Sequence, residues 1–145
     1  MGEILESAGE TLLYGLVGFA VMAVAFVALD LLTPGHLARQ VWKERNKGAS
    51  ILLAGQMLGV GIVLRAAIGA SESEDGLDDG LLSTALYGLA GVVLMTLVFF
   101  VVAALTPGRR GASVMEDRDG HAHPAAWVHG AMYLGTALMV GAAVS

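Results

Sequence analysis

The stretch that decides the fold is LLSTALYGLAGVVLMTLVFFVVAAL, residues 81–105, which runs for 25 residues without a charged side chain. A helix needs roughly 20 apolar residues to cross the hydrocarbon core of a bilayer, so this segment is long enough to span a membrane. Three other segments meet the same criterion with at most one Asp, Glu, Lys or Arg in each: residues 12–32, 49–70 and 124–144. The sequence therefore predicts an all-α integral membrane protein with four transmembrane helices.

The composition of the 145-residue chain agrees with a single membrane domain over residues 1–145. Hydrophobic residues make up 56% and charged residues 14%, which leaves too little polar surface to cover a globule in water. Cysteine is absent, which excludes disulfides and thiol-based catalytic or metal sites. The net charge of −5 argues against nucleic acid as a partner, because phosphate binding requires clustered Lys and Arg.

The charged residues between the predicted helices orient the chain in the membrane. The second connection, residues 71–80, is acidic and has no basic residue, whereas the first and third connections hold most of the Lys and Arg: Arg39, Lys43, Arg45, Lys47, Arg109, Arg110 and Arg118. Lys and Arg bias short loops toward the cytoplasm. We therefore expect the first and third connections in the cytoplasm, and both termini outside.

The first and third predicted helices match each other at an offset of 73 residues. Tyr14-Gly15-Leu16 recurs as Tyr87-Gly88-Leu89, and Thr33-Pro34-Gly35 recurs as Thr106-Pro107-Gly108. Each Thr-Pro-Gly element is expected to end its helix, because proline cannot continue the hydrogen-bond pattern and glycine tolerates the turn that follows. The repeat predicts two tandem, parallel two-helix hairpins, residues 1–72 and 81–145.

The segment from Asp30 to Gly35, the basic connection after it, and Asn46 leading into a helix with Gly55 and Gly59 resemble the YjfL-like bacterial membrane proteins, domain-of-unknown-function family 350. The resemblance covers nearly the whole chain. It implies a multi-pass protein of the bacterial cytoplasmic (inner) membrane that works within a multi-protein, membrane-stress-type system. The second half departs from the family pattern, because His123 stands where an Asn usually opens the last helix.

Four polar residues within the predicted spans are candidates for an intramembrane site: Asp30, Gln56, Arg65 and His129. Asp30 lies close to a helix end, where a carboxylate could pair with Lys43, Lys47 or His129, or could serve an ion or proton pathway. Arg65 could extend to the lipid headgroups or bind an anion. Gln56 is expected to make an interhelical hydrogen bond.

Two further groups are candidates outside the spans. The basic connection of Arg39, Lys43, Arg45 and Lys47 could bind a peripheral cytoplasmic protein or anionic lipid. In the third connection, alternating carboxylates and imidazoles could bind a divalent metal, although such a loop is more often only solvated: Asp117, Asp119, His121 and His123.

No catalytic motif or phosphate-binding loop is present, so we expect no enzyme and no cofactor. The GxxxG pair Gly55 and Gly59 allows close helix packing, within the chain or in a homo-oligomer. The leading hypothesis is a non-enzymatic, oligomeric scaffold or anchor in the lipid bilayer. A small channel or transporter for ions or polyamines is the alternative, and a metal-dependent membrane enzyme is a third possibility.

Overall fold

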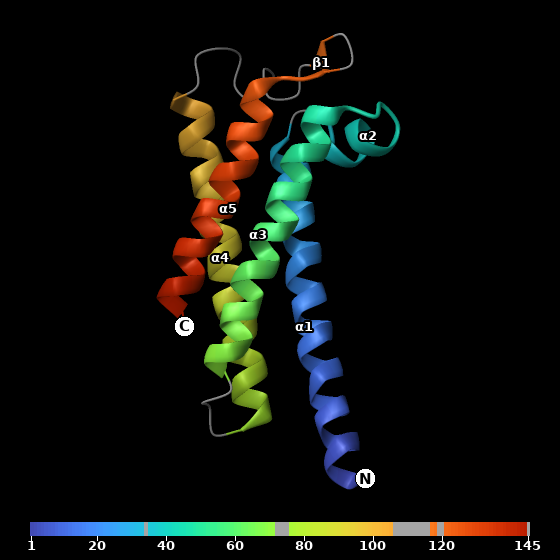
Figure 1. The fold of residues 1–145 in the computed structure, drawn as a ribbon, viewed down its shortest axis with the longest axis vertical. Helices are drawn as coiled ribbons and strands as arrows, with labels where there is room; N and C mark the ends of the chain where they lie inside the picture. Colours follow the sequence, from blue (N-terminus) through green and yellow to red (C-terminus); the bar gives the residue numbers. More distant parts are fainter. Residues whose placement is uncertain (34, 72–75, 106–116, 119–120, 145) are drawn as a thin grey trace.

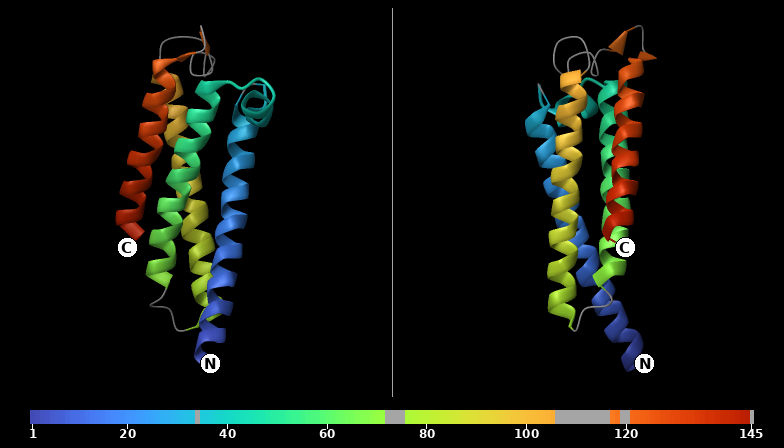
Figure 2. Two further views of the ribbon diagram at one scale, coloured as in Figure 1. Left: turned by 45° about the vertical axis from the view of Figure 1, so that its right-hand side comes forward. Right: turned by 90° about the vertical axis from the view of Figure 1, so that its left-hand side faces the viewer.

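A computed structural model describes residues 1–33, 35–71, 76–105, 117–118 and 121–144 (Figure 1). Its elements are α1 (Gly2–Leu32), α2 (Leu37–Trp42), α3 (Lys47–Ser71), α4 (Leu77–Leu105), β1 (Asp117–Arg118), β2 (His121–Ala122) and α5 (Pro124–Val144). The four long helices form an up-and-down bundle, in which α1 and α4 run in one direction and α3 and α5 in the other (Figures 1 and 2). Each is long and apolar enough to cross a membrane. The predicted fold class of four transmembrane helices is confirmed, and the tandem repeat stays a prediction.

The helix starts differ from the predicted starts at the acidic segments. α1 begins at Gly2 rather than near Leu12, and its first turns project beyond the bundle (Figure 2). α4 begins at Leu77, so that Asp78 and Asp79 lie in a first helical turn and not in the predicted loop. Carboxylates are stabilised near a helix N-terminus by the helix dipole, so a local cluster of acids does not end a helix there.

Helix α3 lies at the centre of the bundle and contacts α1, α2, α4 and α5. Its closest approach is to α5, where a Cβ atom on Gly55 would lie 2.7 Å from the Cα of Gly130. One turn further along α3, a Cβ atom on Gly59 would lie 3.3 Å from the Tyr133 carbonyl oxygen and would overlap the Met95 side chain. The GxxxG pair of α3 is therefore used for packing within the chain.

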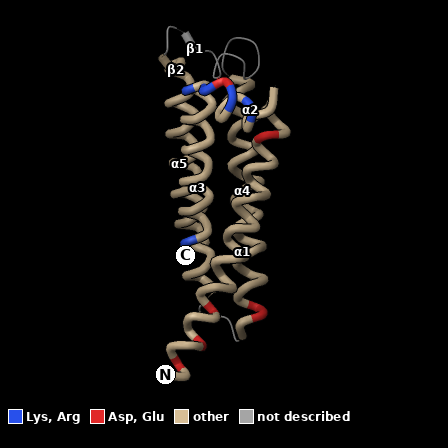
Figure 3. The backbone as a smooth tube through the Cα atoms, turned by 90° about the vertical axis from the view of Figure 1, so that its right-hand side faces the viewer, with Lys and Arg blue, Asp and Glu red and all other residues tan. Residues whose placement is uncertain are grey.

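Charge is unevenly distributed along the bundle: most described Lys and Arg residues lie at one end, together with Asp30 and Glu44, and most other described Asp and Glu residues lie at the opposite end (Figure 3). The basic end comprises α2 and the first turn of α3, and the acidic end comprises the start of α1 and the first turn of α4. The core lies between these two ends. In its half nearer the acidic end, five aliphatic residues are at most 5% exposed: Val21, Val60, Val63, Leu64 and Val92. Large apolar side chains are exposed around the bundle, as expected for a surface that lipid solvates.

The Gly55–Gly130 contact predicts which glycine substitutions the bundle tolerates. Gly55→Leu should destabilise the detergent-solubilised protein by about 1–3 kcal/mol or more, since the added side chain meets backbone atoms that cannot move aside. Gly135→Leu is the matched control, because a Cβ atom there meets nothing within 4 Å. Thermal unfolding followed by circular dichroism measures both. Equal stability of the two variants would contradict the packing described above.

Candidate functional site

Helix α2 lies across the basic end of the bundle (Figure 1), in the first connection, where we predicted a loop. The chain turns into it through two residues with positive φ, Gly35 at 92° and His36 at 60°. Leu37 is fully buried against the bundle, whereas Arg39 and Trp42 on the same helix are exposed. α2 is therefore a short amphipathic helix fixed to the end of the core.

The carboxylate of Asp30 holds the start of α2. Its Oδ1 accepts a hydrogen bond from the Ala38 N–H at 2.8 Å, and its Oδ2 lies 3.4 Å from His36 Nδ1. The first N–H groups of a helix lack intrahelical partners, and a carboxylate beside them is favourable. Asp30 thus joins the last turn of α1 to the first turn of α2.

These partners differ from the ones that we expected for Asp30, which were Lys43, Lys47 or His129. His129 instead donates from its Nδ1–H to the carbonyl of Ala125, on its own helix, at 2.9 Å. His36 was not among the predicted site residues. Its position directly after the Thr-Pro-Gly turn, six residues beyond Asp30, is the only local signal for this contact.

Asn46 joins α2 to α3. Its side-chain Oδ1 accepts the Ala49 N–H at 2.9 Å and so caps the start of α3, a role for which asparagine is well suited. Its own backbone N–H donates to the carbonyl of Gln40, in α2, also at 2.9 Å. Asn46 therefore has the structural role of holding the end of α2 against the start of α3.

Aromatic residues lie beside α2 at the basic end. The rings of Phe26 and Trp42 meet edge to face with centroids 6.1 Å apart. Trp42 is 64% exposed, and Trp127, at the start of α5, is 65% exposed. Tryptophans in this position are typical of the boundary between hydrocarbon and headgroups.

The four predicted basic residues of the first connection are all exposed at this end: Arg39, Lys43, Arg45 and Lys47. Arg39 pairs with Glu44 at 3.1 Å, an exposed ion pair that contributes little stability. Lys43 and Arg45 make no ion pair with the residues that the structure describes. We name α2 together with these four residues the basic platform. Arg109 and Arg110 lie outside the described residues.

A hollow of about 440 Å³ adjoins the basic platform, between α3, β2 and the start of α5. Its lining combines cationic, hydroxyl and aromatic side chains: Lys47, Ser50, Ile51, His121, Ala122 and Trp127. Such a lining suits an acidic or amphipathic group from a partner molecule.

The candidate metal loop is only partly described. His123 Nδ1 accepts the Ala125 N–H at 3.1 Å and so caps α5, while His121 is exposed on β2. Asp119 lies outside the described residues, as does the Asp117 side chain. Within the described ranges, no group of three His, Asp or Glu side chains could hold a metal ion.

The middle of the bundle contains a buried polar layer of Gln56, His129 and Tyr133, each at most 3% exposed. Gln56 donates from Nε2 to the carbonyl of Ala25 at 3.0 Å, which links α3 to α1. The rings of His129 and Tyr133 flank Phe99 of α4, at centroid distances of 6.1 and 6.4 Å. Gln56 Oε1, His129 Nε2 and Tyr133 Oη have no hydrogen-bond partner among the described residues. Tyr133 was not among the predicted site residues, although its spacing of four residues from His129 places both on one helix face.

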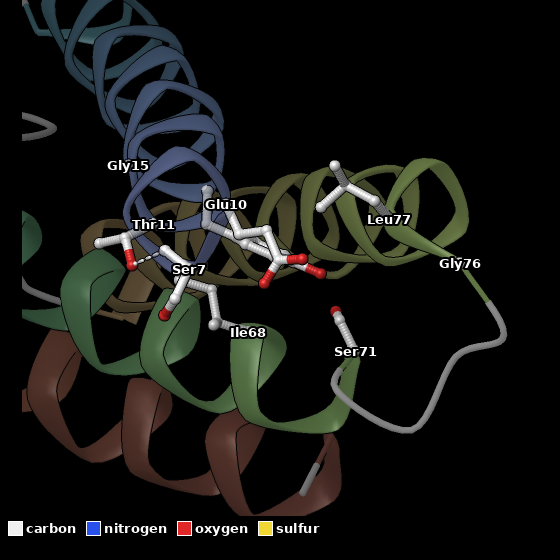
Figure 4. Close-up of a pocket in the computed structure, with 9 residues that line it drawn as sticks. Ser7, Glu10, Thr11, Gly15, Ile68, Ser71, Gly76 and Leu77 are labelled. Atoms are coloured by element: carbon white, nitrogen blue, oxygen red, sulfur yellow. Dashed lines mark hydrogen bonds between the residues drawn. The ribbon is translucent and has the colours of Figure 1, made fainter. Parts of the chain in front are cut away.

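A second polar hollow, of about 680 Å³, lies at the acidic end between α1, α3 and α4 (Figure 4). Glu10 points into it from α1, with Ser7 and Thr11 beside it (Figure 4). At its edge Ser71 bonds to Thr84, with 2.8 Å between the hydroxyl oxygens, which ties α3 to α4. The fourth intramembrane candidate, Arg65, is exposed on α3 toward this end, and so is distant from Asp30.

Of the predicted structural residues, Thr33 is buried at the end of α1, where its N–H donates to the Leu29 carbonyl at 3.0 Å. Gly35 has the left-handed φ that the predicted turn requires. Pro34 and the second element, Thr106, Pro107 and Gly108, lie outside the described residues.

The Asp30 contacts predict how the basic platform can be loosened. Asp30→Ala should raise the hydrogen-exchange rate of the Ala38 amide about tenfold to a hundredfold, because a hydrogen bond to a charged acceptor is worth about 1.5–3 kcal/mol. Asp30→Asn keeps one acceptor oxygen and should have a smaller effect. Asp78→Ala removes an exposed carboxylate at the acidic end and is the control. Unchanged exchange at Ala38 in Asp30→Ala would show that α2 does not depend on this carboxylate.

Comparisons with known proteins place the chain in a family. The family described as Domain of Unknown Function (DUF350) matches residues 3–144. A UPF0719 transmembrane protein of Mycolicibacterium paratuberculosis is 34% identical over 145 residues, which are 100% of this chain and 93% of the relative. A UPF0719 transmembrane protein of Mycobacterium bovis is 38% identical over 143 residues, 98% of this chain and 90% of the relative. No solved structure matches the chain significantly. With its four membrane-spanning helices and a match over nearly its whole length, the chain belongs to the DUF350 family of transmembrane proteins.

Proposed function

We propose that this protein is a non-enzymatic anchor in the bacterial cytoplasmic (inner) membrane, whose basic platform binds a peripheral cytoplasmic protein. The observation that carries the proposal is that the platform is fixed to the bundle while its cations are exposed. Asp30 holds the start of α2, and Asn46 joins its end to α3. A surface that is ordered before binding loses little conformational entropy when a partner arrives.

The charges of the platform define the partner's chemistry. Lys43 and Arg45 are exposed and make no ion pair among the described residues, so they are available to an acidic surface. Charges at the rim of an interface mainly speed association and exclude wrong partners. The hollow beside Lys47 and Trp127 adds a place where one side chain of the partner could be enclosed. We therefore infer a partner with an acidic surface and an exposed apolar or aromatic group.

The proposed orientation puts the basic platform in the cytoplasm and the N-terminus outside. It is supported by the separation of charge along the bundle (Figure 3), since Lys and Arg favour the cytoplasmic side. The exposed Trp42 and Trp127 at the basic end are consistent with a membrane boundary there. The inner membrane agrees with the helical spans, because bacterial outer-membrane proteins span as closed β-barrels.

Association of several copies stays part of the proposal. Gly55 and Gly59 are already packed against α4 and α5, so a homo-oligomer would use another surface. The outer side of α1 is the best candidate, because Leu12, Leu16 and Phe19 are all at least 65% exposed there. An oligomer would present several basic platforms side by side, which increases the affinity for a partner that has several binding sites of its own.

A small channel or transporter is the second candidate, and the buried polar layer favours it. Gln56, His129 and Tyr133 have unpartnered polar atoms in the middle of the bundle, which water or an ion could satisfy. Toward the acidic end, however, the core of one chain is filled by aliphatic residues such as Val60, Val63 and Leu64. A continuous polar path would therefore require a rearrangement or a pore between copies. This requirement makes the anchor the better supported function.

The orientation predicts which positions a membrane-impermeant reagent can reach. The chain has no cysteine, so single-cysteine variants need no background mutations. Glu6→Cys, at the acidic end, should react with an impermeant maleimide in intact spheroplasts. Lys43→Cys, on the basic platform, should react only after the cells are opened. The reverse pattern would place the basic platform outside the cell and remove the basis for a cytoplasmic partner.

The anchor function predicts that a partner is lost when the platform is neutralised. Cells expressing the wild type should yield a reproducible peripheral protein after cross-linking in native membranes and affinity purification. Its recovery should fall severalfold in the triple variant Arg39→Gln, Lys43→Gln, Arg45→Gln, and with rising salt during purification, because exposed charges are screened.

The triple variant Glu3→Gln, Glu6→Gln, Glu10→Gln changes as many charges at the other end of the molecule and is the matched control. Both variants must reach the membrane in equal amounts for the comparison to hold. Equal partner recovery from the wild type and both variants would exclude the basic platform as the binding surface.

A further inference from the structure

Arg65 is a cation within a membrane-spanning helix that has no ion pair with any described residue. It lies in the 25-residue helix α3, and about 9 Å of helix axis separates it from the end at Ser71. Its side chain is exposed on the outer surface of the bundle. It points away from the buried polar layer, and no described residue supplies an anion to pair with it.

Two grooves, lined mostly by apolar residues, lie on either side of Arg65. One, of about 560 Å³, runs between α3 and α1 and is lined by Gly61, Met22 and Phe19 among others. The other, of about 670 Å³, runs between α3 and α5 and is lined by Ile62, Gly69 and Leu138 among others. Arg65 and Ile68 line both grooves, so the guanidinium group belongs to the ridge that separates them.

Outward-facing glycines keep these grooves open. A Cβ atom at Gly61 or Gly69 would meet nothing within 4 Å, in contrast to Gly55 and Gly59 on the inner face of the same helix. Packing within the chain therefore does not explain these two glycines. Their effect is to leave room along the surface of α3 on both sides of Arg65.

We propose that this face of α3 is a binding site for one anionic phospholipid with two acyl chains. Arg65 would bind the phosphate, and each groove would receive one chain. Arginine is well matched to phosphate, which it can contact through two N–H groups at once. The depth of Arg65 in the bilayer suits contact with a phosphate. The 25-residue α3 is longer than a hydrocarbon core of about 30 Å, so Arg65 lies just inside the core, and a long arginine side chain extends from there to the headgroups.

The positions of the grooves agree with the shape of such a lipid. On α3, one groove begins at Ile68 and the other at Ala70, nearer the end of the helix, and both extend past Arg65 to Gly61 or Ile62, nearer the bilayer centre. The two acyl chains of a phospholipid also extend from its phosphate, at the headgroup level, toward the bilayer centre. The site lies at the acidic end, in the leaflet opposite the basic platform, so lipid binding there does not involve the platform.

The test is lipid retention, measured by native mass spectrometry of protein reconstituted in vesicles of equal parts phosphatidylglycerol and phosphatidylcholine and then released in mild detergent. The wild type should retain one phosphatidylglycerol, with a preference over phosphatidylcholine of about tenfold or more. Arg65→Gln should abolish the preference. Gly61→Leu and Gly69→Leu, which fill one groove each and leave the charge, should reduce retention severalfold. Lysophosphatidylglycerol, which has a single chain, should compete poorly.

Arg118→Gln removes one cation from β1, which lies at the basic end but is not part of the basic platform, and is the control, so it should retain the lipid as the wild type does. The proposal is overturned if Arg65→Gln retains phosphatidylglycerol like the wild type, if Arg118→Gln loses it equally, or if the wild type retains none. It is also overturned if the wild type is a lipid-free dimer that Arg65→Gln dissociates, because this face would then bind a second copy of the chain.

Discussion

The approach of Gly55 on α3 to Gly130 on α5 is the contact on which the rest of the bundle depends. Two helices can come this close only where neither carries a side chain. With α3 held in this way, Gly59 receives the Met95 side chain from α4, and Gln56 faces the Ala25 carbonyl of α1. One backbone contact therefore fixes the rotation of the central helix against its three long neighbours.

The polar side chains inside the protein serve mainly to join helices. Lipid offers no hydrogen bonds, so a buried donor or acceptor is stable only with a partner in the protein. Asp30 joins α1 to α2, Gln56 joins α3 to α1, and Ser71 joins α3 to Thr84 of α4. In the buried polar layer, however, Gln56, His129 and Tyr133 each keep one polar atom that has no hydrogen-bond partner among the described residues. A search for chemistry inside the bundle should begin there.

The sequence was sufficient for the class of protein and for where most helices end, since long uncharged runs and a proline after a helix have direct physical meanings. It did not predict α2, because six residues among charged neighbours are too short for a periodic pattern. The partners of Asp30 also could not be predicted from the sequence. The main partner is a backbone N–H, which lies close to Asp30 only because of the turn at Gly35 and His36. A GxxxG pattern shows that helices can approach but not which partner they meet, so the assignment of Gly55 and Gly59 to contacts within the chain required the structure.

The separation of charge along the bundle makes the molecule an electric dipole that is aligned with the membrane normal (Figure 3). A transmembrane voltage acts on such an object directly, at about 2.3 kcal/mol for each elementary charge moved fully across 100 mV. When the compartment at the basic end is electrically negative, the voltage favours the orientation that the charges already specify and opposes inversion. A membrane potential of this sign would thus stabilise the orientation of the protein in the membrane, and loss of the potential would remove part of that stabilisation.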